Sequence, residues 1–170
     1  MKIIKKKIES DLIEGLTIIK LVTFQDFRGE IWTVYSDEYT DLKFVADKIT
    51  ISRFGVLRGM HGDPYTAKLI TCLSGQLQLA VADLRGGSKT YGNVETFLLN
   101  DYDPTVVVVP AGCVNGHLCL SYKWSEHYKG PQEQVTIAWD DPAFDIDWVI
   151  KNPILSERDK NGRPYKEIRL

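Results

Sequence analysis

The sequence predicts an all-β fold, and three observations carry this prediction. Short runs rich in β-branched and aromatic residues recur along the chain at strand length. Clusters of Gly, Pro, Asn, Asp and Ser, which favour turns, separate these runs. One run, Gln76–Leu84, alternates regularly and places Leu77, Leu79 and Val81 on one face. Many short strands at regular spacing are typical of a sandwich, a jelly roll or a barrel.

The expected strands follow one another through most of the chain, and one short helix is expected near its end. Asn152 and Pro153 have the residue types of a helix N-cap and first turn, which predicts a helix over Ile154–Asp159. At 170 residues the chain fits one domain, 1–170. In chain order the expected strands are Leu16–Thr23, Ile31–Tyr35, Phe44–Ser52, Val56–His61, Lys68–Leu73, Gln76–Leu84, Val94–Leu99, Thr105–Val109, Gly116–Ser121, Trp124–Tyr128 and Gln134–Trp139.

Composition and charge exclude several classes of protein. The chain has 21 Lys and Arg against 23 Asp and Glu, which argues against a dedicated nucleic-acid-binding protein. No stretch approaches the ~20 apolar residues of a membrane-spanning helix. The three cysteines, Cys72, Cys113 and Cys119, lie in apolar runs without a C-x-x-C pair. We therefore expect buried thiols, and a reducing cytoplasm as the compartment.

The chain has three histidines, His61, His117 and His127, of which His61 is the strongest catalytic candidate. An imidazole titrates near neutral pH and suits a general base, although a hydrogen-bonded histidine at a strand end explains His61 equally well. Strict alternation puts Arg58 and His61 on opposite faces unless Gly59 marks a bulge. A metal site is not expected, because the H-x-H pattern with a nearby Glu is absent.

A second polar cluster lies around Tyr128 and Glu133. A barrel tyrosine usually belongs to the core or rim, and its functional alternative is to donate a proton or to stabilise an oxyanion. Asn115 and His117 are two residues apart, so both face the same side of an extended strand.

Seven segments in order resemble one family. From about residue 24 to residue 159 the chain is similar to the dTDP-4-dehydrorhamnose 3,5-epimerase family of cupins. The segments that carry the resemblance are Asp26–Gly29, Gly55–His61, Val81–Arg85 with Ser88–Gly92, Pro110–Ser121, Tyr128–Lys129, Trp139–Pro142 and Leu155–Asp159.

The resemblance implies a cupin-type jelly-roll β-barrel with one or two short helices, acting as an isomerase. It implies a homodimer that exchanges N-terminal strands and binds a nucleotide-diphosphate sugar inside the barrel, with no nucleic-acid or membrane partner. The implied reaction is epimerisation at C3, C5 or both of a dTDP- or GDP-linked 4-keto-6-deoxy sugar, for surface polysaccharide synthesis. The C4 ketone makes the neighbouring C–H bonds acidic through an enolate, so no cofactor is expected.

The resemblance also assigns roles to individual residues. The general base falls on His61, Asp159 would fix its tautomer, Tyr128 is the acid, and Lys68 lies near the ketone oxygen. Asn115 or His117 would join Lys68 in stabilising the enolate. The residues implied in substrate binding are Arg28, Arg58, Asn115, His117, Glu133, Asp47 and Lys48.

Several recognition positions depart from the family pattern. The family's second pocket histidine reads Asn115 here, a glutamate reads Thr33, and a Gln-Asp-Asn triplet reads Ala46-Asp47-Lys48. This predicts the same proton chemistry on a different substrate, such as a GDP-linked or longer sugar. Two alternatives remain: a ketoisomerase that moves the carbonyl from C4 to C3, and a sugar-binding cupin without catalysis.

Overall fold

The computed structural model describes residues 2–117 and 120–170, with the backbone alone for 120–122. Most of this chain is β-structure, as predicted. The strands are β1 (Ile4–Glu9), β2 (Thr17–Leu21), β3 (Phe24–Asp26), β4 (Gly29–Ile31), β5 (Ala46–Thr50), β6 (Arg58–Gly62), β7 (Lys68–Thr71), β8 (Gln76–Asp83), β9 (Val94–Asn100), β10 (Thr105–Val109), β11 (Cys113–His117), β12 (Leu120–Trp124) and β13 (Val135–Thr136). The helices are α1 (Glu157–Lys160) and the 3-10 turns η1 (Asp37–Tyr39), η2 (Pro131–Glu133) and η3 (Tyr165–Glu167).

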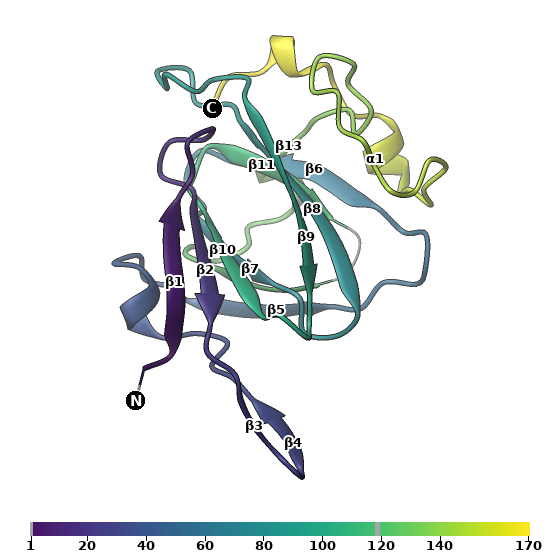
Figure 1. Cartoon of the computed structure of the whole chain (residues 1–170). Helices are drawn as coiled ribbons and strands as arrows, with labels where there is room; N and C mark the ends of the chain where they lie inside the picture. The colour runs from purple at the N-terminus through teal and green to yellow at the C-terminus, as the bar shows by residue number, and fades with distance from the viewer. Residues whose placement is uncertain (1, 118–119) are drawn as a thin grey trace.

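Two antiparallel sheets face each other. The order is β1-β2-β10-β7-β12-β5 in the six-stranded sheet and β13-β6-β11-β8-β9 in the five-stranded sheet. Strands β3 and β4 form a separate hairpin that extends away from the rest of the chain (Figure 1). Several strands that are neighbours in space, such as β2 with β10 and β6 with β11, come from distant parts of the sequence, as in a jelly roll.

Apolar residues fill both faces of the two sheets. Strand β10 shows the alternation: Val107 and Val109 join the core between the sheets, and Val106 and Val108 join a cluster on the outer face. In β8, the predicted set led by Leu77 also faces the core between the sheets, which confirms the alternation read from the sequence.

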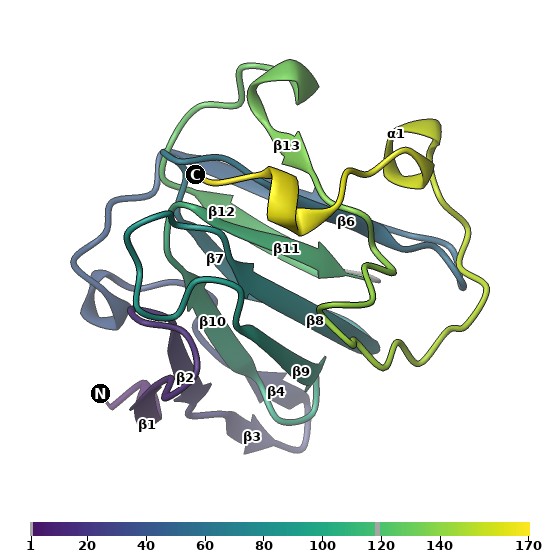
Figure 2. The same cartoon turned by 90° about the horizontal axis from the view of Figure 1, so that it is seen from above.

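The C-terminal segment covers the outer face of the five-stranded sheet. Its side chains Phe144, Trp148 and Ile168 are at most 6% exposed and pack in one cluster with Met60 and Val114 of the sheet. Figure 2 shows this segment lying across β6, β11 and β8. This packing places α1 beside strand β6, so that Asp159 of α1 contacts His61 of β6.

Some predicted strands are wrong. Of Ile31–Tyr35, only Ile31 lies in a strand; Trp32 and Tyr35 instead pack against the outer cluster of the six-stranded sheet. The prediction over Trp124–Tyr128 also fails, because β12 ends at Trp124 and Tyr128 lies in the loop that follows. Aromatic side chains favour strands on average but also pack well as loop anchors, so composition alone misplaced these segments.

The strand predicted over Gly116–Ser121 overlaps the end of β11 and the start of β12, which are two separate strands. Residues 118–119 within it, including Cys119, lie outside the described residues. Cys72 and Cys113 are buried thiols, as expected. Strand β1 was missed because its sequence is rich in charged residues, and β3 was missed because it has only three residues, so neither shows an apolar alternation.

The one predicted helix is present but starts later than expected. It begins at Glu157, and its N-cap is Ser156, whose hydroxyl accepts a hydrogen bond from the Asp159 amide, so Asn152 and Pro153 do not cap it. In the described part of the chain, no helix has the length and apolar character that a membrane crossing would need.

Candidate active site

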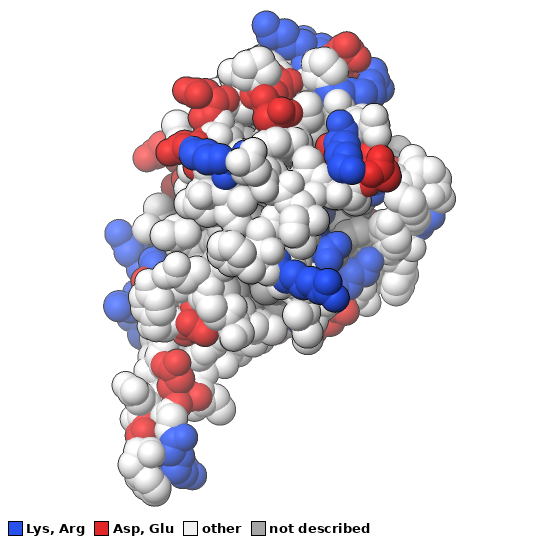
Figure 3. All heavy atoms as spheres, turned by 90° about the vertical axis from the view of Figure 1, so that its right-hand side faces the viewer, with Lys and Arg blue, Asp and Glu red and all other residues white. Residues whose placement is uncertain are grey.

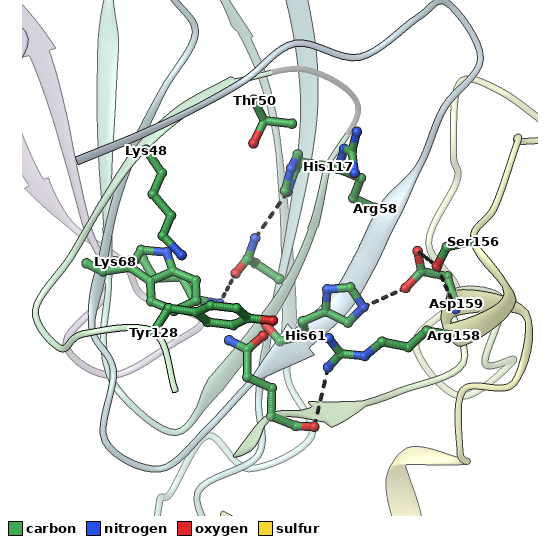
Figure 4. Close-up of a pocket in the computed structure, with 13 residues that line it drawn as sticks. Lys48, Thr50, Arg58, His61, Lys68, His117, Tyr128, Ser156, Arg158 and Asp159 are labelled. Atoms are coloured by element: carbon green, nitrogen blue, oxygen red, sulfur yellow. Dashed lines mark hydrogen bonds and ion pairs between the residues drawn. The ribbon is translucent and has the colours of Figure 1, made fainter. Parts of the chain in front are cut away.

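A cavity of about 360 Å³ opens between the two sheets. Strands β5, β7 and β12 contribute one wall, and β6 and β11 contribute the other. The loops around residues 128 and 134 and the start of α1 complete it (Figure 4). The lining residues are Lys48, Thr50, Arg58, His61, Lys68, Asn115, His117, Trp124, Tyr128, Gln134, Ser156, Arg158 and Asp159.

A bulge in β6 aims two side chains into this cavity. Asn115 of β11 pairs with His61, but His117 pairs with Arg58, so β6 holds one more residue than β11 over this stretch. Arg58 and His61 therefore both line the cavity, while Met60 joins the apolar cluster on the opposite face. The bulge at Gly59 that the sequence left open is confirmed.

The bulge requires glycine at position 59, because a side chain does not fit there. Its φ is +133°, and a Cβ would lie 2.4 Å from Cα of Gly116 and 2.7 Å from the carbonyl oxygen of Asn115. Both contacts are with backbone, so the paired strands would have to separate. Gly29 has a similar φ of +131° with nothing within 4 Å of a Cβ.

We expect Gly59→Ala to lower the free energy of unfolding by about 2–5 kcal/mol, through backbone strain together with the steric overlap. Denaturant titration measures the change. Gly29→Ala is the matched control, since it adds strain without overlap and should cost clearly less. Equal losses in the two variants would contradict the close approach of β6 to β11.

His61 and Asp159 form a hydrogen-bonded pair at the cavity wall. Nε2 of His61 lies 2.5 Å from Oδ1 of Asp159, and Ser156 donates its hydroxyl to the second carboxylate oxygen at 2.8 Å. Burial acts to raise the pKa of Asp159, but the hydrogen bonds from His61 and Ser156 hold it below the ordinary value. Asp159 is therefore a carboxylate that accepts, which makes Nε2 of His61 the donor and leaves the lone pair on Nδ1.

The His61 imidazole is neutral at physiological pH. Burial lowers its pKa below the ordinary value, and the neighbouring Asp159 only partly opposes that effect. The side chain is still 22% exposed, so it is accessible from the cavity. A neutral imidazole with a fixed tautomer and an accessible nitrogen can accept a proton.

Lys68 is a buried cation on the opposite wall. It shares the inward face of β7 with Ile70 and is only 4% exposed. Its Nζ donates to the carbonyl oxygen of His61 at 3.0 Å and to Oδ1 of Asn115 at 2.6 Å. Burial lowers the pKa of Lys68 to about 8, so the ammonium form predominates at neutral pH.

Lys48 lies against two aromatic rings beside the cavity. Its Nζ is 3.9 Å from the ring centroid of Trp124 and 4.0 Å from that of Tyr128, which is cation–π distance to both. The two rings also contact each other edge to face at 5.1 Å. These contacts hold the Tyr128 ring at the cavity although no strand carries it.

The cavity is strongly basic. Among the described residues that line it, Lys48, Arg58, Lys68 and Arg158 are cationic and Asp159 alone is acidic. Figure 3 shows Lys and Arg side chains beside a hollow in one face of the chain. Such a site favours an anionic ligand such as a diphosphate.

Most of the predicted site residues meet here. Eight of them line the cavity: His61, Asp159, Tyr128, Lys68, Arg58, Asn115, His117 and Lys48. The other three do not reach it within one chain. Arg28 pairs with Asp26 on the β3–β4 hairpin, Asp47 pairs with Lys123 on the outer side of β5, and Glu133 borders a smaller hollow behind Tyr128.

Sequence reasoning missed five lining residues: Thr50, Trp124, Gln134, Ser156 and Arg158. Arg158 donates to Thr136 Oγ1 at 2.6 Å and to the Gln134 carbonyl at 3.3 Å, which fixes α1 against β13. Ser156 and Arg158 belong to the same short motif as Asp159, so that motif was a signal for both. Within residues 2–117 and 120–170 no group of three or more His, Cys, Asp or Glu side chains could hold a metal ion.

Comparisons with known proteins agree with this geometry. A family model described as dTDP-4-dehydrorhamnose 3,5-epimerase matches residues 10–167. A dTDP-4-dehydrorhamnose 3,5-epimerase of Methanothermobacter thermautotrophicus is 32% identical over 171 residues, covering 91% of this chain and 92% of its own.

Two solved structures extend the likeness to the fold. The crystal structure of dTDP-6-deoxy-D-glucose-3,5-epimerase from Legionella pneumophila in complex with dTDP-4-keto-L-rhamnose has a TM-score of 0.88 at 26% identity, covering 96% of this chain and 94% of that one. A 3'-monoepimerase from Streptomyces bikiniensis in complex with dTDP-quinovose has a TM-score of 0.84 at 27% identity, covering 98% and 88%. The cupin-type jelly roll is thereby confirmed.

Proposed function

The chain belongs to the dTDP-4-dehydrorhamnose 3,5-epimerase family, and from this premise we propose how its cavity epimerises a nucleotide-linked 4-keto-6-deoxy sugar. The observation that supports the proposal most is the presence of one imidazole–carboxylate pair, one tyrosine and one buried ammonium around a single cavity. The protein is an isomerase, and its substrate is a nucleotide sugar with a ketone at C4.

His61 is the proposed base. Its neutral imidazole removes the proton from the carbon beside the ketone, and Asp159 stabilises the imidazolium that forms. The C–H electron pair moves into the C3–C4 or C4–C5 bond, and the carbonyl becomes an enolate. Ser156 holds Asp159 in place from the other side at 2.8 Å.

Lys68 is the proposed stabiliser of the enolate oxygen. An ammonium has three N–H donors, and two of them have acceptors among the described residues, His61 and Asn115. The third can reach the substrate oxygen. A cation that is already in position and shielded from water stabilises the developing negative charge without any rearrangement of the protein. This electrostatic stabilisation is usually the largest contribution to the rate increase of such a site.

Tyr128 is the proposed acid. It enters the cavity after β12, whereas His61 enters from β6 of the facing sheet (Figure 4). A sugar ring between them has the base on one face and the phenol on the other, so a proton leaves one face and another arrives on the opposite face. Inversion of the carbon follows from this placement.

The diphosphate is proposed to bind at Arg58, Lys48 and Arg158. Ser52 anchors Arg58 by accepting a hydrogen bond from its Nε at 3.1 Å, and the Arg58 guanidinium suits bidentate contact with phosphate oxygens.

Burial of the thiols of Cys72 and Cys113 in apolar surroundings supports a reducing compartment, and we propose the cytoplasm.

The rate should depend on pH through two groups. His61 must be neutral to accept a proton, and because burial lowers its pKa, kcat/KM should fall with acid only below the pH at which an ordinary histidine titrates. Lys68 must be protonated, and because burial lowers its pKa to about 8, kcat/KM should fall again above about that pH. A pH profile of the wild-type enzyme measures both limbs. A profile that keeps rising through pH 9 would contradict the role of Lys68.

The enzyme is also proposed to be a homodimer that exchanges its N-terminal hairpin. Phe27 at the tip of the β3–β4 hairpin is 98% exposed, and Ile31 is 70% exposed. On the outer side of the edge strand β5 and just beyond it, Ile49 and Ile51 are 69% and 86% exposed. Apolar surface of this extent supports an interface between copies of the chain. A partner's hairpin on β5 would bring a second Arg28 near the cavity.

Mixing two inactive variants tests this exchange. Arg28→Gln chains keep His61, and His61→Asn chains keep Arg28. If Arg28 acts in the partner's cavity, each mixed dimer holds one cavity with both native residues, so mixing and refolding should restore activity that neither variant has alone. Sedimentation should show dimers, which Phe27→Asp disrupts and Leu98→Asp, on the exposed side of β9, does not. No restoration in confirmed mixed dimers would contradict the exchange.

Deuterium incorporation tests the function itself. The enzyme is incubated in D₂O with a dTDP-linked and, separately, a GDP-linked 4-keto-6-deoxyhexose, and NMR follows C3 and C5 of each. Deuterium at one or both carbons with inversion is the expected result for one of them. A product with its carbonyl at C3 would indicate the ketoisomerase instead, and tight binding without exchange would indicate a binding protein.

A further inference from the structure

Three buried polar side chains form a hydrogen-bonded chain beside the cavity: Lys68 on β7 and Asn115 and His117 on β11. They are 4%, 5% and 8% exposed. Nζ of Lys68 donates to Oδ1 of Asn115 at 2.6 Å, and Nδ2 of Asn115 lies 3.4 Å from Nδ1 of His117. Figure 4 draws both contacts as dashed lines.

The direction of each hydrogen bond follows from the chemistry of the groups. A lysine ammonium has no lone pair and only donates, so the Asn115 atom beside it must be the carbonyl oxygen. The amide nitrogen of Asn115 is then left facing His117, and an amide NH₂ also only donates. Nδ1 of His117 is therefore the acceptor. In a neutral imidazole an accepting nitrogen carries no proton, so the proton of His117 is on Nε2.

The protonated, charged form of His117 is not populated at neutral pH, so it does not disturb the hydrogen bond from Asn115 to Nδ1. Burial lowers the pKa of His117 to about 3, and the positive charges near it act in the same direction. The charges that lower it are those of Lys68, Arg58 and the protonated form of His61, and Asp159 opposes them. At neutral pH the imidazole is therefore uncharged.

We propose that Asn115 is a positioning residue that fixes His117 in the Nε2–H tautomer and so prevents it from acting as a second base. The Nδ1 lone pair is engaged by the Asn115 amide, and Nε2 already carries a proton. His61 has the opposite arrangement, because its Nε2 donates to Asp159 and its Nδ1 keeps the lone pair. The cavity thus holds one imidazole that accepts a proton and one that does not. The part of this inference that concerns catalysis rests on the proposed function, whereas the tautomer does not.

The tautomer can be observed in the free protein by two-bond ¹H–¹⁵N correlation NMR, which distinguishes protonated from unprotonated ring nitrogens. The chain has three histidines, so three imidazoles appear, and His117→Gln identifies one of them by its loss. We expect an unprotonated Nδ1 and a protonated Nε2 for His117 between pH 6 and 8. A protonated Nδ1 at neutral pH overturns the proposal, whatever the enzyme's activity.

Asn115→Asp tests whether Asn115 is the cause. The shape is kept, but the oxygen that replaces the amide nitrogen can only accept, so His117 has to place a proton on Nδ1. We expect the His117 spectrum to change to a protonated Nδ1. The new carboxylate should also raise the pKa of Lys68 by ~1–3 units in a ¹³Cε titration. Asn152→Asp, the same change at an exposed position, should leave both spectra as in the wild type.

The outcomes separate this proposal from the proposed function. An unchanged His117 spectrum in folded Asn115→Asp overturns the role of Asn115. If the variant does not fold, the wild-type tautomer alone decides the proposal. If deuterium exchange fails with every nucleotide sugar but the tautomer is as expected, the proposed function fails while the hydrogen-bond arrangement stands.

Discussion

Replacing His61 with asparagine is expected to abolish deuterium incorporation at the carbons beside the ketone and to lower kcat by about 10²–10⁴-fold. His61 is the one residue proposed to remove the substrate proton, and asparagine does not accept a proton at neutral pH. KM should change little, since the arginines and lysines proposed to bind the diphosphate are untouched. Deuterium exchange followed by NMR, with kcat measured alongside, provides the comparison.

Tyr128→Phe is the informative partner of this variant. The base remains, so a proton still leaves, but the enolate now recovers its proton mainly from the His61 side. Exchange should therefore continue while the yield of inverted product falls. Loss of exchange and inversion together in Tyr128→Phe, or preserved exchange in His61→Asn, would reverse the proposed roles of the two residues.

The fold should tolerate His61→Asn. Asp159 keeps its hydrogen bonds with Ser156, so one hydrogen bond is lost, at a cost of about 1–3 kcal/mol. A denaturant titration that shows a larger loss would mean that the activity change reports unfolding.

Lys68→Met is expected to have the second largest effect, with kcat lower by about 10²–10³-fold, because the enolate loses its preorganised cation. The residual activity should also lose its fall above pH ~8, since the group with the pKa of about 8 is gone. A purely structural role for Lys68 would reduce the amount of active enzyme without changing the shape of the pH profile, so a persistent fall near pH 8 would contradict the assignment.

The stability of Lys68→Met should change little, because two effects oppose each other. Removing a buried ammonium removes the cost of keeping it away from water. The carbonyl of His61 and the amide oxygen of Asn115 then lose their donor, which costs about 1–3 kcal/mol for each unsatisfied group. Chemical denaturation measures the balance, and circular dichroism should show the wild-type β-spectrum.

Local pattern predicted the architecture well because strand faces repeat every two residues. The alternation in β8 identifies its inward face without knowledge of the partners, and the apolar run of β10 indicates a strand buried on both faces. The strand prediction failed in aromatic-rich segments. Trp32, Tyr35 and Tyr128 anchor loops against the sheets, and nothing within a few residues distinguishes a loop anchor from a strand residue.

The sequence motifs also identified most of the residues of the site. His61, Lys68, Tyr128 and Asp159 lie on four separate segments, and all four line one cavity. Arg28 does not, because it lies on a hairpin that extends away from its own chain. A motif shows which residue has a given role, but it does not show where that residue lies. The distance of the residue from the cavity depends on how the chain packs and, in our proposal, on a second copy of the chain.

By itself the sequence determined the β-architecture, the family and the residue types that we propose to move a proton, since these depend on short-range pattern and on side-chain chemistry. Tertiary structure alone decided the rest. The bulge that turns Arg58 and His61 to one side exists only because β6 pairs with β11. The proton position that we propose for His117 follows only because Lys68 of one sheet meets Asn115 of the facing sheet and so fixes which Asn115 atom faces His117. The pairing of β6 with β11 and the contact of Lys68 with Asn115 join residues far apart in the chain, so no local pattern encodes them.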